Sequence, residues 1–165
     1  MRGQENHSIY GPTGDWFAAE ILPVLYEAHK DGIRIKEGDF KKFLKSHGAT
    51  IQKGEWYFKP DDAYYFKDTN EVIIYEFKSQ YCTGTADEKP AGCEWHLLAY
   101  KRWLSEIGIP PENVHMFYIF NDWFKQPKFT WMLEYMKLKG VDYCFWWDDN
   151  DEKNRIINYR MTKNN

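Results

Sequence analysis

The chain has 165 residues, of which 43% are hydrophobic and 19% aromatic, with a mass of 19.9 kDa. This composition excludes a disordered chain, and the length predicts one domain over residues 1–165 with one core. The formal net charge of −3 argues against a protein whose whole surface coats a nucleic acid, although it leaves room for local basic patches.

Membrane association and disulfide bonding are both disfavoured by the sequence. No apolar run approaches the ~20 residues of a membrane-spanning helix, and residues 1–14 lack the apolar stretch of a signal peptide, so we expect a cytoplasmic protein. Cys82, Cys93 and Cys144 are odd in number and lack CxxC spacing, which argues against a disulfide framework. A zinc site using two of them and His96 would lack a clear fourth ligand, so reduced, mostly buried thiols are the better interpretation.

The N-terminal third predicts two helices followed by a strand. Residues 1–12 are polar and turn-rich and predict an extended arm. Apolar residues at helical spacing predict a helix from Thr13 to Gly32, which Pro23 should kink. A shorter helix is predicted from Asp39 to Ser46 with its lysines facing solvent, and the pattern from Thr50 to Lys59 is strand-like.

The middle of the chain predicts a β-hairpin and then a helix. Residues 62–66 and 71–79 are strand predictions, joined by the turn residues 68–70. A helix is predicted from Ala91 to Ile107, with Gly108 at its C-terminal cap. Its large apolar residues fall mainly on one side: Trp95, Leu98, Trp103 and Leu104.

The C-terminal third completes an α/β pattern. Val114–Phe120 predicts a strand buried on both faces, 127–139 a helix, and 141–147 a further strand. The acidic run 148–152 is interpreted as a solvated turn, and 156–160 as a last strand. The element order predicts a mixed central β-sheet flanked by helices.

Two charged residues of the predicted strand 71–79 attract attention because of the face on which they lie. Alternation places Glu76 and Lys78 on the same face as two aliphatic residues. A charged side chain on a buried face is unfavourable unless it is paired or bound to a metal.

The preceding strand brings an aspartate opposite this pair. Asp61 and Asp62 point to opposite faces, so only one can lie opposite Glu76: Asp61 if the turn has an even number of residues, Asp62 if it has an odd number. The residues alone leave both registers open. Two adjacent carboxylates repel unless a cation intervenes, and oxygen ligands favour Mg²⁺. A lysine beside such an ion is suited to phosphoryl chemistry.

The same region resembles a known enzyme family. Pro60-Asp61, fourteen intervening residues and Glu76-Phe77-Lys78 resemble the signature of the PD-(D/E)XK nuclease superfamily. The segments KPDDAYYF, YEFKSQ and GTADEK also resemble successive segments of a group of restriction endonuclease-like proteins. This likeness covers about residues 57–104, and it implies a restriction endonuclease-like core.

The resemblance assigns roles to individual residues. It implies that Asp61, rather than Asp62, and Glu76 are catalytic metal ligands, and that Lys78 is the catalytic lysine. The backbone carbonyl of Phe77 would complete the coordination of Mg²⁺, for which Mn²⁺ could substitute.

Further site residues are expected around this centre. Similar nucleases often add a catalytic glutamate from the first helix; Glu20 is the candidate, and a solvated helix charge is its alternative. Gln80 is expected to orient a water or to contact the DNA backbone. Asp87-Glu88-Lys89 either caps the next helix, which we favour, or places substrate. Candidate phosphate contacts are basic side chains: Lys41, Lys42, Lys101 and Arg102.

The function implied by the resemblance is Mg²⁺-dependent endonucleolytic hydrolysis of DNA by a metal-activated water, leaving 5′-phosphate and 3′-hydroxyl ends. A restriction-type role is the leading expectation. The alternatives are a structure-specific, phage or mobile-element nuclease, an RNA substrate, or a non-catalytic module that binds nucleic acid. Cutting both strands would most simply use a homodimer on a two-fold site.

Overall fold

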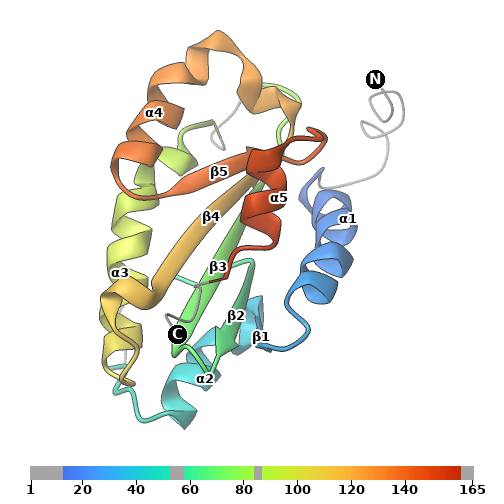
Figure 1. Cartoon of the computed structure of the whole chain (residues 1–165). Coiled ribbons are helices and arrows are strands. Elements are labelled where there is room, and N and C mark those ends of the chain that lie inside the picture. Colours follow the sequence, from blue (N-terminus) through green and yellow to red (C-terminus); the bar gives the residue numbers. More distant parts are fainter. Residues whose placement is uncertain (1–12, 53–57, 84–86, 161–165) are drawn as a thin grey trace.

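The computed structural model describes residues 13–52, 58–83 and 87–160 (Figure 1). Its helices and strands follow in this order: α1 (Thr13–Ala28), β1 (Ile33–Lys36), α2 (Phe40–Ser46), β2 (Asp62–Phe66), β3 (Glu71–Lys78), α3 (Cys93–Ser105), β4 (Val114–Phe120), α4 (Thr130–Leu138), β5 (Asp142–Phe145) and α5 (Asp151–Ile157). Short 3-10 helices precede several of them: Glu37–Asp39, Lys89–Gly92, Pro111–Asn113, Asp122–Lys125 and Pro127–Phe129.

The five strands form one mixed sheet in the order β1-β2-β3-β4-β5. The first three are antiparallel, and β3, β4 and β5 run parallel. Helices α3 and α4 form the crossovers between the parallel strands, since parallel neighbours need a long connection. The predicted α/β class, with a mixed sheet flanked by helices, is confirmed.

Helices cover both faces of the sheet. In Figure 1, α3 and α4 lie to the left of the sheet and α1 and α5 to the right. The alternation of β3 explains the two layers: Val72 and Ile74 pack with α2, α3 and α4, whereas Ile73 and Tyr75 pack with α1 and α5. Each layer has its own core cluster, and the sheet separates the two.

Most of the predicted elements lie where the periodicity placed them. Helix α1 contains Pro23 and ends at Ala28, four residues before the predicted end. In α2, Phe40 and Leu44 are buried, which leaves the lysines of this helix on the outer side. Strand β4 is buried along both faces, as the run of apolar residues predicts. No described helix combines the length and apolar character needed to cross a bilayer.

The prediction around the first strand was wrong. The structure places a strand at Ile33–Lys36, where four residues are too few for a recognisable alternation. Residues 50–52 and 58–59 are not in a strand, and 53–57 lie outside the described residues. Strand β1 exists because it pairs with β2, Arg34 opposite Tyr64, which is a tertiary contact that no local pattern contains.

The prediction of a last strand over 156–160 was also wrong, because α5 occupies Asp151–Ile157. The side chain of Asn150 accepts a hydrogen bond from the Lys153 backbone N–H and caps this helix. Acidic residues in the first turn favour the positive end of the helix dipole. The acidic run therefore leads into a helix: residues 148–150 precede it, and Asp151 and Glu152 lie in its first turn.

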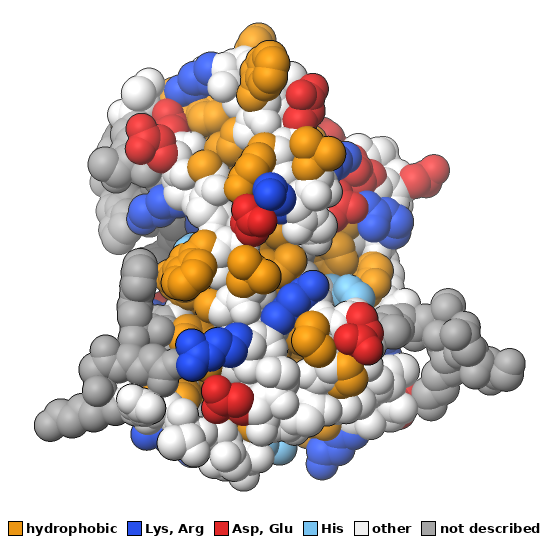
Figure 2. Space-filling model, turned by 90° about the vertical axis from the view of Figure 1, so that its left-hand side faces the viewer, with side chains coloured by type: hydrophobic (Ala, Val, Ile, Leu, Met, Phe, Trp, Pro, Cys, Tyr) orange, Lys and Arg blue, Asp and Glu red, His pale blue; other side chains and the backbone are white. Residues whose placement is uncertain are grey.

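Two residues predicted on the apolar side of α3 are exposed instead. Trp95 and Leu98 keep 58% and 55% of their surface, because α3 buries the narrower stripe through Leu97, Tyr100 and Leu104. Figure 2 views the molecule from the α3 and α4 side and shows hydrophobic side chains down this face, with basic side chains between them. The most exposed large apolar residues of α4 are Trp131 (84%) and Leu138 (83%).

Candidate active site

The β2–β3 hairpin determines which aspartate lies beside Glu76. Tyr65 pairs with Val72, so the turn holds the four residues 67–70, and this is the even register. Asn70 in the turn has a φ of 50°, a conformation that asparagine tolerates better than most residues. With Asp62 opposite Tyr75, the residue before β2, Asp61, reaches the level of Glu76.

Three oxygen atoms surround the ammonium group of Lys78. Its Nζ lies 3.1 Å from Glu76 Oε2, 3.3 Å from Asp61 Oδ2 and 3.0 Å from the backbone oxygen of Phe77. These are the three oxygen atoms that the resemblance to PD-(D/E)XK nucleases implies as metal ligands. The structure therefore brings Asp61, Glu76, Phe77 and Lys78 together at the C-terminal end of β3.

Neighbouring groups hold both carboxylates in place. The backbone N–H of Phe77 donates to Asp61 Oδ2 at 2.7 Å, and the hydroxyl of Tyr100 on α3 donates to Glu76 Oε1 at 3.1 Å. The Lys78 ammonium also lies 5.8 Å from the centre of the Tyr118 ring. Each carboxylate is thus oriented by a donor other than Lys78.

Burial makes the charges of this cluster strongly interdependent. Glu76 is 5% exposed. Burial raises its pKa to about 7, and the negative charge of Asp61 adds to the rise, although Lys78 and Tyr100 oppose it. Burial alone would lower the pKa of Lys78, but Glu76 and Asp61 outweigh it and hold that pKa above its usual value. One ammonium group does not fully compensate two carboxylates here.

This donor set fits a hard divalent cation. Two carboxylates and one carbonyl oxygen already surround one positive centre, and such oxygen atoms are the ligands that Mg²⁺ prefers. Across 13–52, 58–83 and 87–160, no three His, Cys, Asp or Glu side chains gather to hold a metal. Mg²⁺ usually keeps several water ligands, so two carboxylates and one carbonyl oxygen would be enough from the protein.

Asp62 lies on the other face of the sheet and has a structural role. It is fully buried, and its carboxylate accepts hydrogen bonds from Arg34 Nε at 2.8 Å and from the Tyr64 hydroxyl at 2.7 Å. Burial raises its pKa, while both donors oppose the rise. The adjacent aspartates therefore belong to separate networks.

Two other predicted residues have hydrogen-bond partners outside the cluster. Glu20 lies on α1, which covers the opposite face, and its carboxylate accepts a hydrogen bond from Trp146 Nε1 at 3.2 Å. Gln80 follows β3, and its backbone N–H and carbonyl form hydrogen bonds with the Asn121 side chain. Its side-chain amide donates to the Cys82 carbonyl at 2.7 Å. Gln80 thus stabilises the segment that follows β3.

The predicted phosphate contacts are divided between two places. Lys41 and Lys42 line a shallow depression on α2, beside Phe40, whose ring packs edge-on at 5.5 Å against Tyr100. Lys101 and Arg102 lie further along α3, and Lys101 lines a cavity at the far end of β4.

Asp87 anchors a loop near the site. Its carboxylate accepts hydrogen bonds from Trp123 Nε1 and from Lys128 Nζ, both at 2.9 Å. The residue thus joins the loop before α3 to the loop after β4, a structural role different from the predicted helix cap.

The sequence interpretation assigned no role to the aromatic residues around the cluster. Tyr100 and Tyr118 are fully buried, and among the described residues the Tyr118 hydroxyl has no hydrogen-bond partner. His96 is half-buried, with its ring 4.1 Å from that of Phe58; burial and then Lys78 lower its pKa. Tyr100 could have been found, since a tyrosine on the buried side of a predicted helix needs a polar partner.

The chain was compared with family models, curated proteins and solved structures, and none of them matches it.

Proposed function

We propose that this protein is a Mg²⁺-dependent DNA endonuclease with a restriction endonuclease-like core. The observation that carries the proposal is the convergence of Asp61, Glu76 and the Phe77 carbonyl on the ammonium of Lys78. Residue types, spacing along the chain and position at the end of the hairpin strand agree with the PD-(D/E)XK resemblance.

Each residue of the cluster has a role in the proposed reaction. Asp61, Glu76 and the Phe77 carbonyl would hold Mg²⁺. The bound ion would lower the pKa of a water molecule, so that the water can ionise and attack a phosphodiester. Tyr100 and the Phe77 N–H orient the carboxylates before substrate binds. Lys78 steadies the attacking water and offsets the negative charge that develops on the phosphate.

The substrate side of the proposal rests on α2. Phe40 of this helix contacts Tyr100, which in turn binds Glu76. Lys41 and Lys42 lie on the outer side of the same helix, and we expect neighbouring phosphates of a duplex bound at the cluster to reach them. Binding through such phosphate contacts should weaken steeply with salt. Restriction-type cleavage is the role we propose, and it requires that cuts recur at one short sequence.

The test is cleavage of supercoiled plasmid in Mg²⁺ or Mn²⁺ by the wild type, Asp61→Asn, Glu76→Gln and Lys78→Met. The matched control is Lys67→Met, which removes an exposed lysine from the same hairpin. We expect each cluster variant to lose at least about a hundredfold in rate and the control to retain wild-type activity. End sequencing of the products would show whether the cuts share a recognition sequence.

Equal rates for the wild type and Lys78→Met, or no cleavage by either with both ions, would contradict the enzymatic proposal. The remaining function would then be a nucleic-acid-binding module on this fold. Parallel assays on duplex DNA, single-stranded DNA and RNA identify the substrate class, and preferential cleavage of RNA would contradict the DNA assignment.

A further inference from the structure

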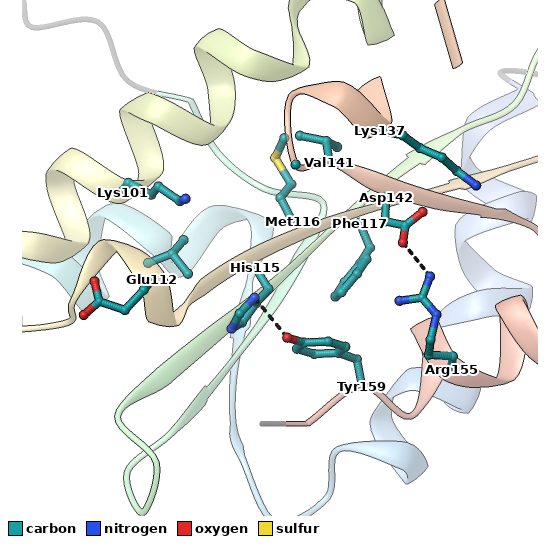
Figure 3. A pocket seen from close by; sticks show the side chains of 12 residues that line it. Lys101, Glu112, His115, Met116, Phe117, Lys137, Val141, Asp142, Arg155 and Tyr159 are labelled. Atoms are coloured by element: carbon teal, nitrogen blue, oxygen red, sulfur yellow. Dashed lines mark hydrogen bonds and ion pairs between the residues drawn. The ribbon is translucent and has the colours of Figure 1, made fainter. Parts of the chain in front are cut away.

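A cavity of about 360 Å³ opens where β4 and β5 begin, and the proposed reaction does not use it (Figure 3). Its position along the sheet separates it from the Lys78 cluster. Val114 on its wall pairs with Val72, whereas Glu76 pairs with Tyr118, four residues further along. At about 3.3 Å per strand residue, the Val114 end of the cavity lies roughly 13 Å from the level of Glu76 along β4, although the lining extends to Phe117.

Lys101 supplies an unbalanced positive charge at this cavity. Figure 3 shows its side chain extending from α3 toward the cavity, while the Glu112 carboxylate points away. On the opposite wall, Asp142 is already paired with Arg155, and Lys137 with Glu152. Within the described residues no carboxylate pairs with Lys101, so the cavity favours an anion.

Three adjoining rings form the other side of the cavity. The ring centres of Phe117 and Tyr159 are 4.9 Å apart, those of His115 and Tyr159 are 4.7 Å apart, and the Tyr159 hydroxyl lies 3.2 Å from His115 Nδ1. Burial, and then the charge of Lys101, lowers the pKa of His115 to about 4. The imidazole is therefore neutral near pH 7 and belongs to an uncharged aromatic wall, whose rings are inclined at 52° and 56° to that of Tyr159.

We propose that this cavity is a binding site for a nucleotide, with the base against the ring of Tyr159 and the phosphate at Lys101. The volume is in the range of small-ligand pockets. Aromatic rings favour a flat partner, and an ammonium group favours a phosphate. The ligand could be a free mononucleotide or the 5′-phosphorylated end of a strand, which share this chemistry. The inference does not depend on the proposed nuclease activity.

Calorimetric titration of the full chain tests the site, and EDTA in the buffer keeps divalent ions from the Lys78 cluster. The probes are adenosine, guanosine, cytidine and uridine monophosphates, a 5′-phosphorylated oligonucleotide, adenosine and inorganic phosphate. We expect saturable binding of at least one phosphorylated nucleoside or of the oligonucleotide, and weaker binding of adenosine and of phosphate. Lys101→Met should weaken the binding about tenfold or more, as loss of a charge-assisted hydrogen bond does. Lys30→Met, which removes an exposed lysine of the loop after α1, should leave it unchanged.

Amide chemical shifts of the wild type locate the ligand even if a variant fails to fold. Shifts concentrated at Met116, Phe117 and Asp142 would support the proposal, whereas shifts concentrated at Phe77 and Lys78 would overturn it. Binding of the oligonucleotide alone identifies the strand end as the ligand, and binding of mononucleotides identifies the free form. Inorganic phosphate binding as tightly as any nucleotide, or no saturable binding up to about 5 mM, would overturn the proposal.

Discussion

At the scale of single residues, the proposed chemistry depends on a carboxyl group whose ionised form is disfavoured by burial. Glu76 is buried beside Asp61, and its pKa of about 7 leaves it partly protonated near neutral pH. Lys78 and Tyr100 contact it without restoring an ordinary pKa. A group held in this state responds strongly to an added cation, which is the behaviour expected of a metal ligand.

The raised pKa of Glu76 predicts a pH-dependent effect of Mg²⁺ on stability. Between pH 4.5 and about 7 the folded protein holds a proton that the unfolded chain has released, so the ion-free protein loses stability as the pH rises through this window. Mg²⁺ requires the ionised form, so its affinity should fall by up to about tenfold per pH unit below 7. Urea unfolding should therefore show greater stabilisation by Mg²⁺ at pH 8 than at pH 5.5. Equal stabilisation at both pH values would contradict this.

The two adjacent aspartates predict opposite phenotypes. Asp62→Ala leaves Arg34 and Tyr64 without their buried acceptor, and should reduce the free energy of unfolding by about 2 kcal/mol or more. Asp61→Asn, at a partly exposed position, should keep the fold and abolish Mg²⁺-dependent cleavage. Denaturation and cleavage should be measured on both variants. If the Asp62→Ala protein folds but does not cleave, while the Asp61→Asn protein still cleaves, the roles of the two aspartates would be reversed.

At the scale of elements, turn and cap residues determine the strand register and the helix ends that position the site. The four-residue turn 67–70 selects the register that brings Asp61 beside Glu76. Gly108, with a φ of 84°, ends the turn after α3, the helix that carries Tyr100. Asn150 similarly determines where α5 starts, and α5 closes the layer opposite the site.

Asn150→Ala should therefore destabilise the protein by about 1 kcal/mol, because the Lys153 N–H loses its capping acceptor. Asn154→Ala, inside the same helix, is the matched control and should be neutral or slightly stabilising, since alanine has the higher helix propensity. Chemical denaturation of both variants measures the difference. A cap variant as stable as the control variant would show that α5 is held by packing alone.

At the scale of the whole molecule, one sheet separates two helical layers. The outer face of the layer formed by α3 and α4 carries exposed apolar side chains. Trp95, Leu98, Trp131 and Leu138 are exposed on α3 and α4 (Figure 2). Exposed apolar side chains gathered on one face mark interaction sites. A second copy is the occupant consistent with the proposed function, since each chain offers one Lys78 cluster and a duplex has two strands.

Sedimentation should accordingly give a mass of twice 19.9 kDa for the wild type. Trp131→Glu places a charge at the most exposed apolar side chain of this face and should yield monomers, whereas Tyr26→Glu, at an exposed position on α1, should remain dimeric. A monomeric wild type at micromolar concentration, or a dimer that Trp131→Glu does not weaken, would contradict this prediction.

The sequence by itself determined the hairpin, α2, α3, β4 and the pairing of Glu76 with Lys78 on one face, because alternation and helical spacing are local properties. It also restricted the opposing aspartate to two choices. Only the tertiary structure decided between them, since register depends on how the turn closes and on which face is buried. Strand β1, the contact between Tyr100 and Glu76, and the distance of Glu20 from the cluster likewise arise from elements far apart in sequence. No local pattern encodes such contacts, because they form when helices pack across the sheet.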